Sequence, residues 1–292
     1  MVLFSLDKEL KLFSKKKLRI MKVKFYGTRG SIPVTESEYQ VYGGNTSCVA
    51  VCYKGGIGIF DAGTGIRNLG IDLFERKTEK FENIFLAFSH FHWDHIQGFT
   101  FFLPAYDSER PLTITAIGIT RNYFDLKSIL ENQMREEFFP IPLETMGAKL
   151  KYIQDESELK IDQDVKIIST NHYHPGGASS YRVEVEGKSV VYTTDVEHGQ
   201  SIDNRVVEIA HEADILIHEA QYTPDELKNK IGWGHSSWEQ AIKVAKLANV
   251  KQLILTHHDP GHNDEFLFKV EKECQEHFPN VVLARDNMEI EL

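Results

Sequence analysis

The sequence has few cysteines, and their spacing follows no repeated pattern. Among 292 residues only Cys48, Cys52 and Cys274 are cysteine. An odd number without regular spacing does not make the disulfide framework that holds small secreted domains together. We therefore expect reduced thiols and a cytoplasmic protein.

Long apolar runs are also missing. No stretch of the sequence approaches the roughly 20 apolar residues that span a bilayer, so we expect no membrane partner. Near the N-terminus, Lys15, Lys16 and Lys17 follow the apolar residues, which is the reverse of a secretory signal. Because Met21 precedes a strand pattern, we interpret residues 1–20 as an N-terminal extension, with a short docking helix as the alternative. Residues 21–292 then form one domain.

An excess of basic charge is absent as well. Lys and Arg number 33 against 43 Asp and Glu, which gives a formal net charge of −10 and a pI near 5.7. Proteins that grip a long polyanion usually present a basic face and a high pI. We therefore do not expect extended nucleic acid as a partner, whereas a short anionic substrate is compatible with this charge.

What the sequence does contain is an alternation of strand and helix patterns. Short β-branched and apolar runs predict strands, and amphipathic segments predict helices. The expected strands span residues 23–26, 48–53, 57–60, 84–88, 112–116, 165–170, 181–186, 189–193, 215–218 and 252–256. The expected helices span residues 66–75, 122–136, 202–210, 238–248 and 265–277. This order indicates an α/β fold, and the polar residues of interest fall where strands end.

A histidine-rich loop follows the strand expected at residues 84–88. It reads His90-Phe91-His92-Trp93-Asp94-His95. In an extended segment His90 and His92 point to the same side, and Asp94 and His95 then open a helix. The loop therefore offers two imidazoles to one position and a carboxylate with an imidazole to a neighbouring one. These are apt ligands for zinc and similar metals, whereas a solvated, histidine-rich turn is the alternative.

Three later strands also end in short runs that contain His or Asp. These runs are Asn171-His172-Tyr173-His174-Pro175-Gly176-Gly177, Thr193-Thr194-Asp195 and Thr256-His257-His258-Asp259-Pro260. One histidine at a strand end is more often structural than a metal ligand. Three such ends downstream of the histidine loop favour a metal site with two ions.

These motifs resemble the metallo-β-lactamase fold superfamily, and the resemblance extends from about Met21 to the C-terminus. Five further segments resemble the branch that includes tRNase Z and related phosphodiesterases. They are Gly27-Thr28-Arg29-Gly30-Ser31-Ile32-Pro33, Gly43-Gly44-Asn45-Thr46-Ser47, Phe60-Asp61-Ala62-Gly63-Thr64-Gly65, and His218-Glu219-Ala220 with Gly234-His235-Ser236. The resemblance implies a four-layered αββα sandwich with metals at one edge between the sheets.

The resemblance also implies the ligand set. His90, His92 and His174 would hold the first metal, whereas Asp94, His95 and His257 would hold the second. Asp195 would bridge both metals. His172 is the alternative to His174, and His258 is the weaker choice beside His257.

Asp61 resembles a residue that fixes the histidine loop by hydrogen bonds. Its alternative role is a helix N-cap. By strand parity Cys48 and Cys52 share one face, and we interpret them as core residues.

The chemistry follows from two divalent ions, for which we expect zinc, with manganese and iron as alternatives. Two cations that share a water lower its pKa to around 7, and the resulting hydroxide is the nucleophile. Asp94 can orient that hydroxide. His235 is the candidate for protonating the leaving alkoxide, and Glu219 is the candidate for orienting His235.

The leading hypothesis is a dinuclear phosphodiesterase that acts on a small substrate such as a cyclic nucleotide or a short oligonucleotide. A tRNA 3′-processing endoribonuclease is the first alternative, but the segment 120–151 lacks the long Gly- and Pro-rich arm usual in that family. A carboxylic ester, lactone or β-lactam hydrolase is the second. A non-catalytic binding protein is the third, and a complete ligand set argues against it. The apolar run 138–143 is a candidate contact in a homo-oligomer.

Overall fold

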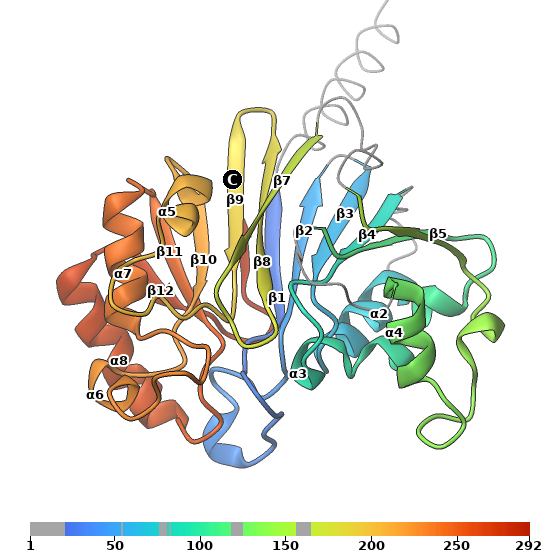
Figure 1. The fold of residues 1–292 in the computed structure, drawn as a ribbon, viewed down its shortest axis with the longest axis horizontal. Coiled ribbons are helices and arrows are strands. Elements are labelled where there is room, and N and C mark those ends of the chain that lie inside the picture. Colours follow the sequence, from blue (N-terminus) through green and yellow to red (C-terminus); the bar gives the residue numbers. More distant parts are fainter. Residues whose placement is uncertain (1–20, 54, 76–80, 82, 118–124, 156–164) are drawn as a thin grey trace, which may run out of the picture.

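The computed structural model describes residues 21–53, 55–75, 81, 83–117, 125–155 and 165–292. Two β-sheets pack face to face, and helices cover the outer face of each (Figure 1). The expected extension at residues 1–20 lies outside the described residues and stays a prediction. Within the described part of the chain, no helix combines the length and apolar character that crossing a bilayer requires.

The first sheet has the strand order β13-β1-β2-β3-β4-β5-β6. Its strands are β1 (Lys22–Gly27), β2 (Cys48–Tyr53), β3 (Gly56–Phe60), β4 (Asn83–Ala87), β5 (Pro111–Thr115), β6 (Lys149–Ile153) and β13 (Glu289–Glu291). Strands β13, β1, β2 and β3 pair antiparallel, whereas β3, β4, β5 and β6 pair parallel. In the parallel half, the histidine loop follows the end of β4.

The second sheet repeats this plan with the order β12-β11-β10-β9-β8-β7. Its strands are β7 (Val165–His172), β8 (Ala178–Val185), β9 (Lys188–Thr193), β10 (Ile215–Glu219), β11 (Gln252–Thr256) and β12 (Val281–Leu283). Strands β7, β8 and β9 pair antiparallel, and β9, β10, β11 and β12 pair parallel. Because the carboxyl ends of parallel strands lie at one edge, the loops after β9, β10 and β11 meet there.

The helices form the two outer layers of the fold. They are α2 (Ile66–Glu75), α3 (Trp93–Ile96), α4 (Leu126–Gln133), α5 (Asn204–Ala210), α6 (Pro224–Leu227), α7 (Trp238–Leu247) and α8 (Asp264–His277). Short 3₁₀ turns are η1 (Ser37–Tyr39), η2 (Phe99–Phe101), η3 (Leu103–Tyr106) and η4 (Leu143–Thr145). Helices α2 and α4 cover the first sheet, and α5, α7 and α8 cover the second.

Strand alternation explains the layering. In β2, Val49 and Val51 pack between the two sheets, whereas Cys48 and Ala50 pack against the helices outside. Burying a side chain such as valine contributes about 1.5–3 kcal/mol, so both faces of this strand stabilise the fold. The order helix, sheet, sheet, helix confirms the four-layered αββα sandwich.

Most expected elements are confirmed, and the errors have physical causes. The patterns at residues 48–53, 66–75 and 252–256 match β2, α2 and β11 at both ends. The helix expected at residues 122–136 is too long: α4 begins after Asp125, whose side chain accepts the Ser128 N–H, and residues 122–124 lie outside the described residues. Strands β6, β12 and β13 were not predicted.

Candidate metal centre

The residues proposed as ligands come from four strand ends. His90, His92, Asp94 and His95 follow β4, and the other three follow β7, β9 and β11. The first and last of them, His90 and His257, are 167 positions apart in the sequence, yet the ligand atoms form groups within 4.8 Å of one another. Two groups matter here. The inner group is Asp94, His95 and His257, the outer group is His90, His92 and His174, and Asp195 lies against both.

The inner group is tight. His95 Nε2 lies 3.3 Å from His257 Nε2, and Asp94 Oδ2 lies 3.2 Å from each of these nitrogens. Asp195 Oδ1 lies 3.3 Å from His95 Nε2 and 3.1 Å from His257 Nε2. Ligand atoms about 2.0–2.1 Å from a tetrahedral zinc ion stand about 3.3 Å apart. The spacing of these four donors therefore fits one bound cation.

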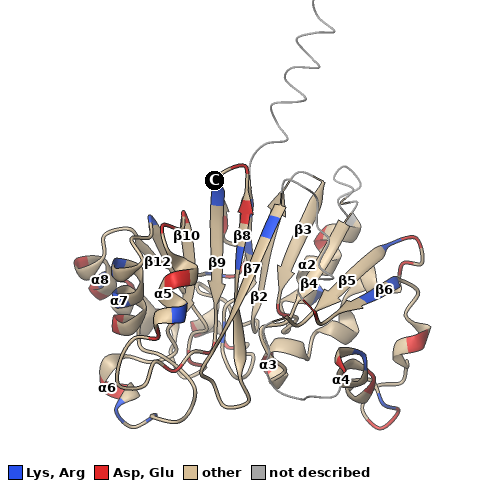
Figure 2. Ribbon diagram, turned by 45° about the horizontal axis from the view of Figure 1, so that its top comes forward, with Lys and Arg blue, Asp and Glu red and all other residues tan. Residues whose placement is uncertain are grey.

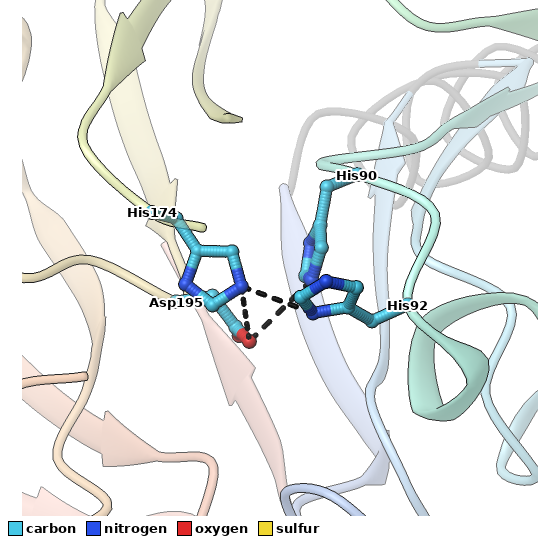
Figure 3. Close-up of side chains that lie close together, drawn as sticks. All are labelled: His90, His92, His174 and Asp195. Atoms are coloured by element: carbon cyan, nitrogen blue, oxygen red, sulfur yellow. Dashed lines mark hydrogen bonds and ion pairs between the residues drawn. The ribbon is translucent and has the colours of Figure 1, made fainter. Parts of the chain in front are cut away.

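The outer group is looser, and Figure 3 shows its members converging from separate loops. His174 Nε2 lies 3.0 Å from His92 Nδ1 and 3.7 Å from Asp195 Oδ2. His90 Nε2 lies 3.5 Å from Asp195 Oδ2. His92 is exposed, whereas the other three are buried. Three imidazoles and a carboxylate oxygen form a donor set that suits a second divalent ion.

Electrostatics support the same interpretation. His90 Nε2 is buried and has no hydrogen-bond partner among the described residues, and burial holds the pKa of His90 well below its usual range. A neutral imidazole with an unpaired nitrogen can bind a metal ion through that nitrogen. Although burial raises the pKa of Asp195, the surrounding imidazoles of His257 and His95 hold it well below its usual range. The residues present therefore fit two divalent ions.

Asp61 supports the inner group from behind. This fully buried residue accepts hydrogen bonds from the backbone N–H and hydroxyl of Ser89, both 2.7 Å long, and from the Tyr192 hydroxyl at 2.8 Å. Its Oδ2 also lies 2.8 Å from His95 Nδ1, which leaves His95 Nε2 for a metal. A carboxylate on the second ring nitrogen fixes the tautomer and the ring orientation. Asp61 does not cap a helix, because α2 begins at Ile66.

Two glycines let the backbone approach the ligand histidines. A Cβ on Gly30 would lie 2.4 Å from His257 Nδ1, and a Cβ on Gly234 would lie 2.3 Å from His174 Nδ1. Gly234 has a φ of 92°, and its carbonyl accepts a hydrogen bond from His174 Nδ1 at 2.7 Å. Glycine at each position keeps the neighbouring imidazole in place.

His172 and His258, the two alternative ligands, join neither donor group. His172 uses both ring nitrogens within the protein, at 3.0 Å from the Thr194 carbonyl and 3.0 Å from the Ser180 hydroxyl. His258 Nε2 lies 2.9 Å from the Ala284 carbonyl. Neither residue belongs to a group of clustered donors in the described part of the chain.

His235 and Glu219 lie next to both groups, with a geometry that differs from the expectation. His235 stacks on His257 with ring centroids 5.2 Å apart, and within the described part of the chain its buried Nδ1 has no hydrogen-bond partner. Glu219 Oε1 lies 3.9 Å from that nitrogen, which is longer than a hydrogen bond. Burial lowers the pKa of His235 to about 3 and raises that of Glu219 to about 8. Glu219 instead accepts backbone N–H bonds from Val196, Gln221 and Ser236.

Sequence reasoning missed two supporting contacts. The Ser31 N–H donates to Asp94 Oδ2 at 2.7 Å, which orients Asp94, although Ser31 lies in a motif that was singled out. The buried Glu197 accepts the N–H groups of Gly232 and Gly234, at 2.8 and 2.7 Å, and so holds the turn that contacts His174. Its position two residues after Asp195 was the only sequence signal for it.

Comparison with known families identifies the superfamily to which a chain with this fold and these donor groups belongs. Residues 59–258 match the family model described as the beta-lactamase superfamily domain. The chain belongs to this superfamily. It is a metal-dependent hydrolase with a metal-binding site for divalent ions.

Within this superfamily, the chain is similar to proteins named Ribonuclease Z and to a structure of tRNase Z. Ribonuclease Z of Enterococcus faecalis is 26% identical over 93% of this chain and 97% of its own length. Ribonuclease Z of Bacillus subtilis is 35% identical over 36% of this chain, and that match spans only 33% of the relative. The crystal structure of human tRNase Z, short form, shares the fold with a TM-score of 0.64 at 21% identity, over 92% of this chain and 98% of that one.

These relatives correct one expectation. We expected a small phosphodiester as partner and no extended nucleic acid, but relatives that match over about nine-tenths of the chain are named Ribonuclease Z. The expectation was wrong because it rested on the net charge of the whole chain. Figure 2 shows acidic and basic positions interspersed over the outer helices and strand ends of the described residues. Divalent ions also add positive charge at the site itself.

Proposed function

We propose that this chain is a zinc-dependent phosphodiesterase whose substrate is RNA. The observation that carries the proposal is the pair of donor groups joined by Asp195, because two adjacent cations suit a phosphodiester with two non-bridging oxygens. Relatives named Ribonuclease Z support RNA as the substrate class.

In this proposal His90, His92 and His174 hold one ion, Asp94, His95 and His257 hold the other, and Asp195 contacts both. Bound divalent ions supply a water of lowered pKa as nucleophile and positive charge for the phosphate oxygens. Histidine and carboxylate donors at tetrahedral spacing favour zinc over magnesium or calcium, which prefer oxygen ligands.

The remaining residues orient and shield the reacting groups. Asp61 and Ser31 fix His95 and Asp94 in place. His235 presents an unpaired ring nitrogen beside the donor groups, where it can hydrogen-bond to the leaving oxygen. Glu219 positions the backbone of Ser236 next to His235 through its accepted N–H bond.

The test compares substrate classes on one preparation. We expect zinc-loaded protein to cleave a tRNA precursor or an unstructured oligoribonucleotide, to lose this activity with a chelator, and to regain it with zinc. The same protein should leave a chromogenic cephalosporin and a lactone intact. Hydrolysis of the cephalosporin or lactone without any phosphodiester cleavage would overturn the proposal.

The role of His235 is tested with matched leaving groups. Burial lowers the pKa of His235 to about 3, so near neutral pH its imidazole assists the leaving oxygen as a neutral hydrogen-bond donor. Such assistance matters most for a poor leaving group, and acid–base assistance is typically worth about 100- to 10,000-fold. His235→Ala should therefore slow cleavage of an oligoribonucleotide by roughly 100-fold, the lower end of that range, and slow cleavage of bis-p-nitrophenyl phosphate much less. Equal losses on both substrates would contradict the role, and metal loss would mean that His235 is a ligand.

A further inference from the structure

Large aromatic side chains are exposed directly beside the proposed metal ligands. Trp93 lies between His92 and Asp94 and is 64% exposed. Tyr173 precedes His174 and is 57% exposed, and Trp233 precedes Gly234 and His235 and is 59% exposed. Each of these three loops thus pairs a buried polar group with an aromatic ring left in solvent. Leaving such rings in water forgoes the stabilisation that burial provides, which favours a binding role.

The turn that bears Trp233 is held rigidly. The backbone N–H groups on both sides of Trp233, from Gly232 and Gly234, donate to the two carboxylate oxygens of the buried Glu197. Both glycines have φ near 90°, a conformation that other residues rarely adopt. The Lys230 ammonium lies 3.8 Å from the Trp233 ring centroid. The indole is therefore presented outward on a fixed turn rather than on a loose loop.

Contacts between the loops bring the three segments that carry these rings to one site. The Glu197 N–H donates to the Tyr173 carbonyl at 3.0 Å, so the residue that clamps the Trp233 turn also binds the Tyr173 loop. His174 contacts His92 and the Gly234 carbonyl, at 3.0 and 2.7 Å. The histidine loop, the loop after β7 and the turn before α7 therefore meet at the donor groups, at one end of the two sheets (Figure 1).

We propose that Trp93, Tyr173 and Trp233 form a stacking platform for the unpaired nucleotides on either side of the scissile phosphodiester. This inference rests on the proposed function, because the platform borders the groups that would act on the phosphate. Aromatic rings stack on any base, and Lys230 adds a cation near the strand. The platform would recognise single-stranded RNA ends through their bases, while the buried donors below act on the backbone. Stacking gives an acidic chain contacts to RNA that do not depend on its net charge.

Binding is measured by tryptophan fluorescence, because the chain has only three tryptophans and Trp238 is buried. The probes are a phosphorothioate-linked hexa-adenylate and an abasic hexamer of the same charge, added to zinc-loaded protein. We expect quenching by the adenylate and not by the abasic chain. Trp233→Phe should remove much of the quenching while keeping the affinity, since phenylalanine still stacks.

Affinity separates stacking from a structural role. Trp233→Ala and Tyr173→Ala should each raise the Kd for the adenylate by roughly 5- to 100-fold, with the Kd for the abasic chain and the zinc content unchanged. Phe268→Ala is the matched control, because Phe268 is an exposed ring with Lys272 4.3 Å away on the outer helix α8. This control should leave the Kd for both probes unchanged.

Three outcomes would overturn the platform. Equal binding of both probes would mean that the contacts are to phosphates, and equal weakening for both with zinc loss would mean that the turn only positions His174. A change in sedimentation of the variants would mean that the rings join copies of this chain. Base-dependent binding without hydrolysis of RNA would leave the platform standing and overturn the proposed function instead.

Discussion

The inner and outer donor groups use similar side chains but are built differently. In the inner group, five distances between donor atoms lie between 3.1 and 3.3 Å, and every member is buried. In the outer group the separations range from 3.0 to 3.7 Å, and His92 is exposed. Asp195 is common to both groups.

The difference lies in what supports each group. The inner donors are held by Asp61 behind His95 and by the Ser31 N–H on Asp94, and both supports are parts of the first sheet and its loops. The outer donor His174 depends on the carbonyl of Gly234, in a turn that also carries the exposed Trp233. The inner position is therefore set by the core, whereas the outer position is coupled to loops that border the proposed substrate site.

The largest effect on metal content and activity is expected at Asp195, because this residue belongs to both donor groups. Asp195→Ala should reduce the zinc content from two ions per chain to one or fewer, and should slow phosphodiester hydrolysis by at least roughly 100-fold. Elemental analysis and rates on the same preparation check both. Two retained ions with near-normal rates would show that Asp195 does not join the groups.

An intermediate effect, which separates the two donor groups, is expected at Asp61. Asp61→Asn keeps the size of the side chain but weakens the charge-assisted contact to His95, so it should lower zinc affinity at the inner position by about 10- to 100-fold. The outer position should change much less. Competition with a chromophoric chelator resolves the two steps. Tyr192→Phe, which removes only one of the hydrogen bonds to Asp61, should have a smaller effect of the same kind. Equal shifts at both steps would contradict the division into two groups.

The smallest effect is expected at His172, which lies beside the outer group without joining it. His172→Gln should leave two zinc ions and normal hydrolysis. It should cost about 1 kcal/mol of unfolding free energy, because buried hydrogen bonds to the Thr194 carbonyl and the Ser180 hydroxyl are disturbed. Denaturant unfolding and metal analysis check this. Loss of one ion would transfer the ligand role from His174 to His172.

Much of the fold and of the donor set could be predicted because the signals are local. The histidine spacing after a buried strand fixes four donors, and apolar runs define most strands of both sheets. Strands β12 and β13 could not be predicted, because each has only three residues, and β13 also pairs with the distant β1. Charge patterning was a poor guide to the partner, since net charge is a sum over the surface and recognition is local.

The support of the site was the least predictable part. The Tyr192 hydroxyl reaches Asp61 across 131 positions, and nothing near either residue in the sequence indicates that bond. Glu197 clamps a turn 35 positions away. Such contacts depend on how the two sheets pack together, which strand and helix patterns do not specify.

Whether the protein is a phosphodiesterase that needs two ions is tested most directly by titrating metal-free protein with zinc. The rate of RNA cleavage is followed during the titration. We expect little cleavage without metal, filling of the tight inner position first, and a rate that rises until two equivalents are bound and then stays constant. A rate that reaches its plateau at one equivalent, or cleavage that does not depend on zinc, would contradict this expectation.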